Sequence, residues 1–310
     1  MNRIERIAII GFGEVGGIFS ADFAQNGLKV AVTDILLREN GSSAAMREKA
    51  RKAVVSTHAF YKDAIAGADV VISAVTSSSS VDAATTASPL LEPDQMYVDI
   101  NSVSPEKKRE IARIIGRSKA KFVEAAVMAP VSPQRLKVPM LLGGPEAHVA
   151  AERLTAMGMN AKAISTQVGV ASAIKMCRSV LVKGLEALAV ECLFAARRYG
   201  AEKEVIASLE ASYPSMGWGN SLPDYLVSRV AQHGRRRAAE MREVAEALKD
   251  VGLDPQMALA TAARQDWLVD EMLKAGISYN GRNFSWTDLA DEIAAEAHEN
   301  VPSKSESNKS

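Results

Sequence analysis

The stretch Ile7-Ala8-Ile9-Ile10-Gly11-Phe12-Gly13-Glu14-Val15-Gly16 decides the fold of the N-terminal half. Its four apolar residues, three of them β-branched, predict a buried strand that runs directly into Gly-x-Gly-x-x-Gly. A helical pattern follows as far as Asn26-Gly27, a pair typical of a helix end. A second predicted strand, Lys29–Thr33, ends at Asp34, which lies 21 residues after Gly13. This order of strand, turn, helix, strand and acid predicts a dinucleotide-binding turn.

Each glycine of the motif has a separate task in such a turn. Gly11 permits the tight bend, Gly13 lets the backbone approach a pyrophosphate, and Gly16 allows the helix to pack closely on the strand. The start of the helix offers N–H groups and a partial positive charge to the phosphates. We therefore expect the whole turn to bind the cofactor, including the residues between the glycines, Phe12, Glu14 and Val15.

Asp34 indicates which cofactor is preferred. A carboxylate at this position accepts hydrogen bonds from the ribose hydroxyls of the adenosine and repels a 2′-phosphate. The sequence therefore favours NAD over NADP. Arg38 and Arg47 follow nearby and leave NADP open, because either cation could fold back over the site.

The composition is that of an ordinary globular protein. The chain has 310 residues, of which 47% are hydrophobic and 24% charged, and its 37 basic and 37 acidic residues balance. This balance gives no indication of binding to nucleic acid or membranes through bulk charge. The first strand begins within a few residues of the start, so we expect no signal peptide and a cytoplasmic location. The four histidines show no metal-ligand spacing, so no metal site is predicted.

Strand and helix signals alternate through the first half, which predicts parallel βαβ units. We expect an α/β Rossmann-type domain over residues 1–167 and an all-α domain over residues 168–300. The polar tail, 301–310, is expected to be disordered. The later strands are expected at 54–55, 69–75, 96–100, 121–125, 139–142 and 161–164.

A second group of residues opens a long helical pattern at Gly169. Helical spacing places Ser172, Lys175 and Ser179 along one face, with Arg178 beside them. This helix is expected to start where the two domains meet, which is a common position for a substrate cleft. Taken alone, Lys175 also fits a surface lysine.

Four stretches resemble, in the same order along the chain, motifs of the β-hydroxyacid dehydrogenase family: Gly11–Gly16, Ala68–Thr76, Asp99–Pro105 and Gly169–Lys175. The resemblance implies that Lys175 is the catalytic acid/base. It also implies that the nicotinamide side of the site is lined by two loops, which contain Val75, Thr76 and Ser77, and Asn101 and Ser102. A lysine suits the reaction, since oxidation of an alcohol needs a base for the hydroxyl proton while hydride leaves for the nicotinamide.

The chain departs from this family in its substrate site. Met128 stands where the family has a serine, and Arg178-Ser179 replaces a pair of asparagines. The helical half resembles a phosphogluconate-dehydrogenase-like branch of the family. Its run from His233 to Arg237, in which Arg236 is the middle one of three arginines, suits a clamp for a carboxylate or phosphate. A solvated face balanced by Glu240, Glu243 and Glu246 explains the run equally well.

The expected function is an NAD(P)-dependent oxidoreductase that transfers hydride between the nicotinamide and a small hydroxy acid or sugar acid. Three alternatives remain at this point: oxidation followed by decarboxylation or rearrangement, reduction of a keto or imine substrate, and a sensor that binds NAD without turnover. The long helix has more apolar surface than a single buried face needs. Members of the family bury such a helix between subunits, so a homodimer or larger assembly is expected.

Overall fold

The computed structural model describes residues 4–39, 42–281 and 284–299, so the predicted disordered tail lies outside the described residues. The chain separates into two compact units, Met1–Cys177 and Arg178–Ser310. The division falls inside helix α8 (Val170–Arg198), ten residues later than the boundary expected after residue 167. Over the described residues, no helix is long and apolar enough to cross a membrane.

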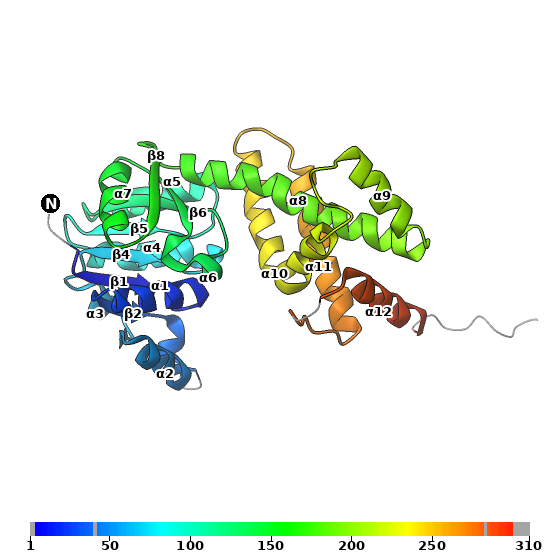
Figure 1. Cartoon of the computed structure of the whole chain (residues 1–310). Helices are drawn as coiled ribbons and strands as arrows, with labels where there is room; N and C mark the ends of the chain where they lie inside the picture. Colours follow the sequence, from blue (N-terminus) through cyan, green and yellow to red (C-terminus); the bar gives the residue numbers. More distant parts are fainter. Residues whose placement is uncertain (1–3, 40–41, 282–283, 300–310) are drawn as a thin grey trace, which may run out of the picture. The chain divides into compact units, whose positions relative to one another are not determined.

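The first unit is a Rossmann-type domain built on an eight-stranded sheet in the order β3-β2-β1-β4-β5-β6-β7-β8 (Figure 1). All neighbouring strands are parallel except the pair β6–β7. The carboxyl ends of β1, β4 and β5 therefore share one edge of the sheet, where loops that bind ligands usually lie. The strands are β1 (Arg6–Ile10), β2 (Lys29–Thr33), β3 (Ser56–His58), β4 (Val70–Ser73), β5 (Met96–Asp99), β6 (Lys121–Val127), β7 (Pro139–Gly143) and β8 (Asn160–Ser165).

The predicted strands occur with one change of position. The strand expected at 54–55 lies instead at Ser56–His58. Val54 is not extended, because it ends the preceding helix in the left-handed conformation, with φ of 57°. The strand therefore begins two residues later than predicted, and its last residue, His58, pairs with Thr33 of β2.

Helices cover both faces of the sheet because each strand of the parallel core is apolar on both sides. Ile7 and Ile9 of β1 pack with Phe19 of α1 on one face, and Ala8 and Ile10 pack on the other. The first face carries α1 (Glu14–Gln25), α2 (Ser43–Ala53), α6 (Val131–Gln134) and α7 (Ala147–Ala156). The second carries α3 (Tyr61–Ile65), α4 (Ser80–Ala87) and α5 (Pro105–Gly116). Short 3₁₀ turns occur at Ile35–Leu37, Ser77–Ser79, Ser88–Leu90 and Arg135–Lys137.

The second unit is helical, as predicted. It contains most of α8 together with α9 (Glu202–Ser212), α10 (Leu222–Lys249), α11 (Gln256–Lys274) and α12 (Trp286–Glu299). Apolar residues from four of these helices form its core, among them Leu193, Val230, Leu268 and Ile293. Gly234 belongs to this packing, since a Cβ there would lie 2.5 Å from Val269 Cγ2 and 2.9 Å from the Gln265 carbonyl oxygen.

Candidate active site

The glycine-rich turn after β1 has the geometry that its sequence predicts. Gly11 adopts φ of +94°, and a Cβ on it would lie 2.4 Å from the carbonyl oxygen of Ala74. A Cβ on Gly16 would lie 1.9 Å from the carbonyl oxygen of Gly11. At Gly13, by contrast, a Cβ would meet nothing within 4 Å. Two glycines therefore allow close packing, and the third leaves open space beside the start of α1.

This open space fits the pyrophosphate of a dinucleotide. Gly13 is the N-cap residue of α1, and its lack of a side chain leaves the first turn of the helix without a side-chain cap. The N–H groups of a first helical turn have no partner within the helix and attract anions. The residues present therefore match the cofactor class that the motif predicts.

Asp34 connects the end of β2 to the glycine-rich turn. One carboxylate oxygen accepts a hydrogen bond from the N–H of Phe12 (2.7 Å) and the other accepts one from the N–H of Leu36 (3.0 Å). The structure thus brings Asp34 against the turn, and its contact with the ribose stays a prediction. Arg38 is anchored elsewhere: its Nε donates to the carbonyl oxygen of Ala59 (2.6 Å), and its guanidinium lies over the Phe60 ring.

The predicted nicotinamide-side loops are tied together by Asn101. Its side-chain oxygen accepts from the N–H of Val75 (2.8 Å), and its side-chain nitrogen donates to Ser73 Oγ (2.9 Å). The amide therefore bridges the ends of β4 and β5 and sets the position of the loop that begins at Val75. Thr76 and Ser77 follow in this loop, where Thr76 Oγ1 donates to Ser79 Oγ.

A buried ion pair that no motif predicted supports Asn101. Asp99 and Lys108 are both almost fully buried, and Lys108 Nζ lies 3.1 Å from Asp99 Oδ1. The same carboxylate oxygen accepts from the N–H of Asn101 (2.8 Å). The available signal was a lysine on the apolar face of a helix that follows an acid at a strand end. Removing either partner of such a pair leaves an uncompensated buried charge.

The start of α8, which carries Lys175, is bound to the sheet by Glu124. This side chain is fully buried in β6, and its two oxygens accept from the N–H groups of Gly169 and Ser172, both at 2.6 Å. A carboxylate at a helix N-terminus is stabilised by the free N–H groups and the helix dipole. Lys175 follows Ser172 by three residues and is half-buried. Glu124 was also missed; its signal is a lone acid within an apolar strand.

The predicted substrate residues are divided between the two units. Ser102 and Met128 are half-buried in the sheet unit, where the N–H of Met128 donates to the carbonyl oxygen of Pro139 (2.9 Å). The helical unit contains the others, of which Arg178 is exposed and Ser179 buried, while His233 is half-buried and Arg236 exposed.

The three arginines of the predicted clamp have carboxylate partners within the helical unit. Arg235 pairs with Asp266 and Asp270, Arg236 with Glu240, and Arg237 with Glu186. These partners lie on α8, α10 and α11, and they balance much of the positive charge of the run. Its use as a substrate clamp stays a prediction.

A buried lysine joins the same network. Lys183 of α8 donates to Glu240, which thus bridges Lys183 and Arg236. Burial lowers the pKa of Lys183, and burial also raises the pKa of the neighbouring Glu186 carboxyl against the opposing effect of Arg237. Lys183, Glu186 and Arg237 therefore hold α8 against α10 with charges that have little access to solvent.

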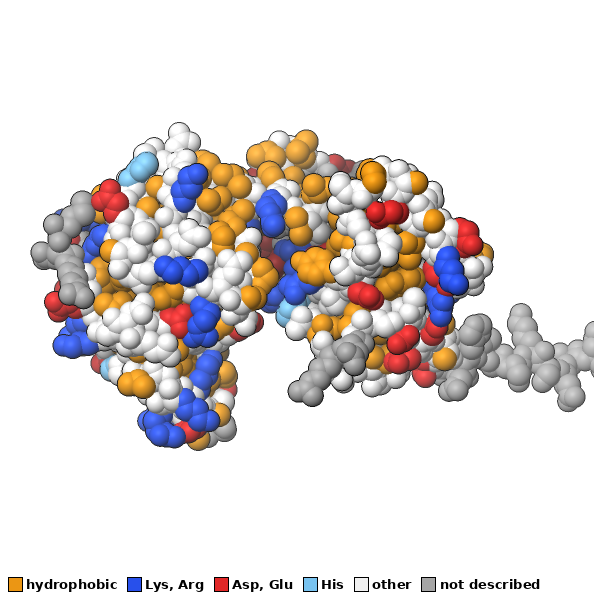
Figure 2. Space-filling model, in the orientation of Figure 1, with side chains coloured by type: hydrophobic (Ala, Val, Ile, Leu, Met, Phe, Trp, Pro, Cys, Tyr) orange, Lys and Arg blue, Asp and Glu red, His pale blue; other side chains and the backbone are white. Residues whose placement is uncertain are grey.

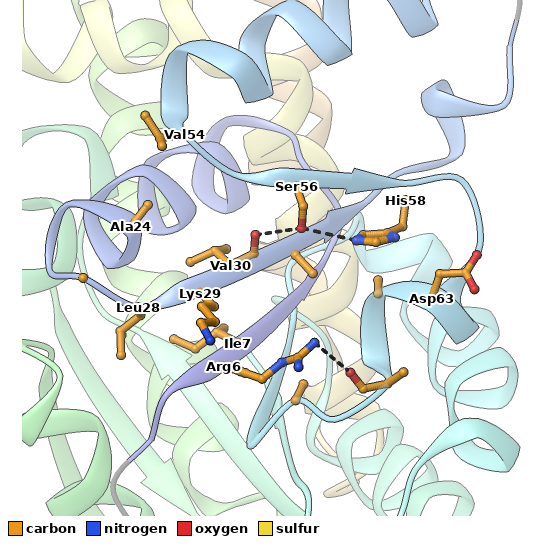
Figure 3. A pocket seen from close by; sticks show the side chains of 15 residues that line it. Arg6, Ile7, Ala24, Leu28, Lys29, Val30, Val54, Ser56, His58 and Asp63 are labelled. Atoms are coloured by element: carbon orange, nitrogen blue, oxygen red, sulfur yellow. Dashed lines mark hydrogen bonds between the residues drawn. The ribbon is translucent and has the colours of Figure 1, made fainter.

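A cavity of about 470 Å³ lies beside β1, β2 and β3 (Figure 3). Arg6, Lys29, His58 and Asp63 contribute its charged or titratable side chains. Arg6 and Lys29 are the first residues of their strands, whereas the glycine-rich turn follows the last residue of β1. No residue of Gly11–Gly16 lines this cavity, so it is separate from the predicted pyrophosphate position.

Two family models match the chain. Residues 6–169 match the NAD binding domain of 6-phosphogluconate dehydrogenase, and residues 196–268 match a domain of unknown function, DUF1932.

Similar solved structures include a conserved hypothetical protein from Sinorhizobium meliloti, which is 34% identical with a TM-score of 0.76 and covers 95% of this chain and 97% of its own. The conserved protein MTH1747, of unknown function, is 34% identical with a TM-score of 0.69, and the match covers 86% of this chain and 98% of MTH1747. MTH1747 is described as structurally similar to 3-hydroxyacid dehydrogenases. The 3-hydroxyisobutyrate dehydrogenase of Mycobacterium tuberculosis shares the fold at 14% identity, with a TM-score of 0.72 and coverage of 94% and 99%.

Proposed function

Because the chain belongs to the β-hydroxyacid dehydrogenase family, in the branch that carries the DUF1932 domain, we propose that it is an NAD-dependent oxidoreductase acting on a small hydroxy acid or sugar acid. The observation that carries the proposal is the arrangement of the sheet unit. This one unit contains both the glycine-rich turn with Asp34 and the start of α8 with Lys175.

The residues of the chain divide the work as follows. The N–H groups at the start of α1 hold the pyrophosphate, and Asp34 accepts hydrogen bonds from the adenosine ribose. Asn101 fixes the loop of Val75, which lines the nicotinamide side. When bound, the nicotinamide accepts or supplies the hydride.

Lys175 is the acid/base that transfers the proton in the same reaction. Its amine takes the hydroxyl proton during oxidation, and its ammonium returns a proton to the alkoxide oxygen during reduction. Glu124 positions the lysine by holding the first turn of the helix at two N–H groups. A rigidly held acid/base is needed because proton transfer requires hydrogen-bond distance.

The departures from the family motif bear on the substrate. Met128 offers a thioether, which is a weak acceptor, where a serine could both donate and accept a hydrogen bond. Arg178 adds a permanent cation that can bind a carboxylate or phosphate through two hydrogen bonds. We therefore place acids, and not neutral alcohols, first among the substrates.

The proposal is tested by incubating the protein with NAD or NADP and a panel of hydroxy acids and sugar acids, and following the absorbance of the reduced cofactor. Turnover of at least one acid is expected. Tight binding of NADH without turnover of any panel member or of the matching keto acids would instead indicate an NAD-binding sensor.

Cofactor preference gives the first specific prediction. We expect NADH to bind more tightly than NADPH, and Asp34→Ala to narrow that difference, because the carboxylate repels a 2′-phosphate. Asp34 also holds the N–H of Phe12, so this variant should weaken both cofactors. The ratio of the two dissociation constants, measured by fluorescence titration, is therefore the informative quantity.

Asp34→Asn is the matched control, since it removes the charge but keeps an acceptor for the Phe12 amide. Asp34→Asn should bring the ratio of the NADPH and NADH dissociation constants closer to one. It should weaken NADH binding less than Asp34→Ala does. A wild-type protein that prefers NADPH by about tenfold, or ~1.4 kcal/mol, would show that Arg38 or Arg47 controls the site and that the NAD assignment is wrong.

Assembly gives the second prediction, a cytoplasmic homodimer formed through α8. Ile174, Leu181 and Leu188 repeat every seven residues, which places them along one side of the helix, and their exposures are 42%, 76% and 54%. Figure 2 shows hydrophobic side chains on the visible face of the helical unit. Burying such a stripe in a second subunit removes apolar surface from water.

Sedimentation at micromolar concentration should therefore give a dimer or a larger species. The double variant Leu181→Glu/Leu188→Glu should shift it to a monomer, because it places two charges in the interface. Leu253→Glu, at an exposed leucine beyond the end of α10, serves as the control and should leave assembly unchanged. A monomeric wild type would count against this proposal.

A further inference from the structure

Lys49 of α2 contacts the glycine-rich turn directly, although no motif in the sequence points to it. Its Nζ donates to the carbonyl oxygens of Phe12 (2.6 Å) and Gly13 (2.8 Å), and it lies 4.5 Å from the centroid of the Phe12 ring. A Cβ on Gly17 would lie 2.7 Å from this Nζ, so the glycine leaves the room that the ammonium occupies.

These two hydrogen bonds orient the turn. In a trans peptide the C=O of one residue and the N–H of the next point in opposite directions. The C=O groups of Phe12 and Gly13 point toward Lys49, and the C=O of Gly13 also accepts from the N–H of Gly17 (3.1 Å). The N–H groups of Gly13 and Glu14 therefore point away from Lys49, and N–H groups at this position of a Rossmann turn are the ones that hold the pyrophosphate.

Asp34 binds the Phe12 backbone in addition to Lys49. The N–H of this residue donates to Asp34, its C=O accepts from Lys49, and its ring is fully buried. Two oppositely charged side chains thus fix the peptide groups on both sides of one residue. Burial lowers the pKa of Lys49, while the negative charge of Asp34 opposes that change.

We propose that Lys49 is a positioning residue for the cofactor, which holds the glycine-rich turn with the N–H groups of Gly13 and Glu14 directed at the pyrophosphate. The inference rests on the cofactor-binding part of the proposed function and is independent of the substrate. It can therefore be tested by binding alone.

The test compares NADH binding to the wild-type protein and to Lys49→Met, Lys49→Arg and Lys52→Met by fluorescence titration. Lys49→Met should weaken NADH about tenfold, or ~1.4 kcal/mol. Lys49→Arg keeps a charged donor and should bind NADH more tightly than Lys49→Met. Lys52 is the matched control, since it is a mostly exposed lysine on the same helix that pairs with Glu48 at 3.7 Å. Its variant should bind NADH as the wild type does.

Competition by cofactor fragments separates positioning from a general effect on the fold. ADP carries the pyrophosphate, whereas adenosine carries only the groups near Asp34. Lys49→Met should weaken ADP and leave adenosine nearly unchanged. This difference between the fragments is expected even if the variant lowers the melting temperature.

Several outcomes would overturn the inference. Equal NADH binding by wild type and Lys49→Met would exclude a positioning role. Equal losses in Lys49→Met and Lys52→Met that vanish at high salt would indicate only long-range attraction. A wild-type protein that binds neither NADH nor NADPH would overturn both this inference and the proposed function, whereas normal wild-type binding with a normal Lys49→Met would overturn this inference alone.

Discussion

Lys175→Met is expected to lower turnover by roughly 10²–10⁴-fold while leaving NADH affinity almost unchanged. The factor is the usual contribution of a positioned acid/base. Cofactor binding should persist because the proposed site holds the pyrophosphate and ribose with the Gly11–Gly16 turn and Asp34, and not with α8. The measurements are steady-state kinetics on the acid found in the substrate panel and a fluorescence titration with NADH.

Lys175→Arg should be nearly as damaging, because a guanidinium does not release its proton at neutral pH. In the wild type, the rate of alcohol oxidation should rise with pH through one ionisation as the ammonium loses its proton, and this rise should be absent in Lys175→Met. Near wild-type turnover by Lys175→Met on the same substrate would remove the main support for this mechanism. The search for the acid/base would then move to His233, with its neighbouring arginines as candidate substrate-binding groups.

Gly16→Ala is expected to weaken NADH binding by about two orders of magnitude and to lower stability. The added Cβ would lie 1.9 Å from the carbonyl oxygen of Gly11, which is backbone and cannot turn aside as a side chain could. The turn or α1 must therefore move, and the N–H groups proposed to bind the pyrophosphate move with it. Overpacking of this kind costs about 1–3 kcal/mol.

Gly13→Ala separates the two effects, because its Cβ meets nothing within 4 Å in the protein. It should leave the melting temperature nearly unchanged but weaken NADH, since the methyl group occupies the space through which the backbone approaches the pyrophosphate. Gly116→Ala, at the end of α5 and also free of contacts within 4 Å, is the control for both measurements. Wild-type affinity in Gly16→Ala or Gly13→Ala would contradict the assigned position of the cofactor.

The order of elements in the first half followed from short patterns. The strand, turn, helix and acid of residues 7–34 are contiguous, so local preferences alone specify the unit. Ser104-Pro105 is a typical helix start in sequence, and the Ser104 side chain does accept from the N–H of Lys107 at the start of α5. The strand after α2 was misplaced by two residues because Val54 adopts a left-handed conformation that β-branched residues rarely take.

The candidate site was predicted less completely. The glycines, Asp34 and Asn101 were identified from motifs, and the structure brings Asp34 to the turn and Asn101 to Val75. Glu124 and Lys49 were missed. Glu124 holds residues that lie 45 and 48 positions later, and Lys49 binds residues 36 and 37 positions earlier. No periodic pattern connects residues at such separations.

The run from His233 to Arg237 shows the same limit. From the sequence, it fitted a ligand clamp and a solvated face equally well. The structure pairs Arg237 with the buried Glu186 of α8, and Arg235 with Asp266 and Asp270 of α11. Of the nearby acids considered as counterions, Glu240 does pair with Arg236, but the partners of Arg235 and Arg237 are more distant along the chain.

The sequence by itself determined the class of domain, the cofactor-binding turn and the family, because these depend on backbone conformations and side-chain periods within a few turns or strands. Only the tertiary structure decided which charged groups meet: Glu124 with the start of α8, Lys49 with the glycine-rich turn, and Asp99 with Lys108. An ion pair or a hydrogen bond depends on distance in space, and that distance is set by the packing of helices on the sheet.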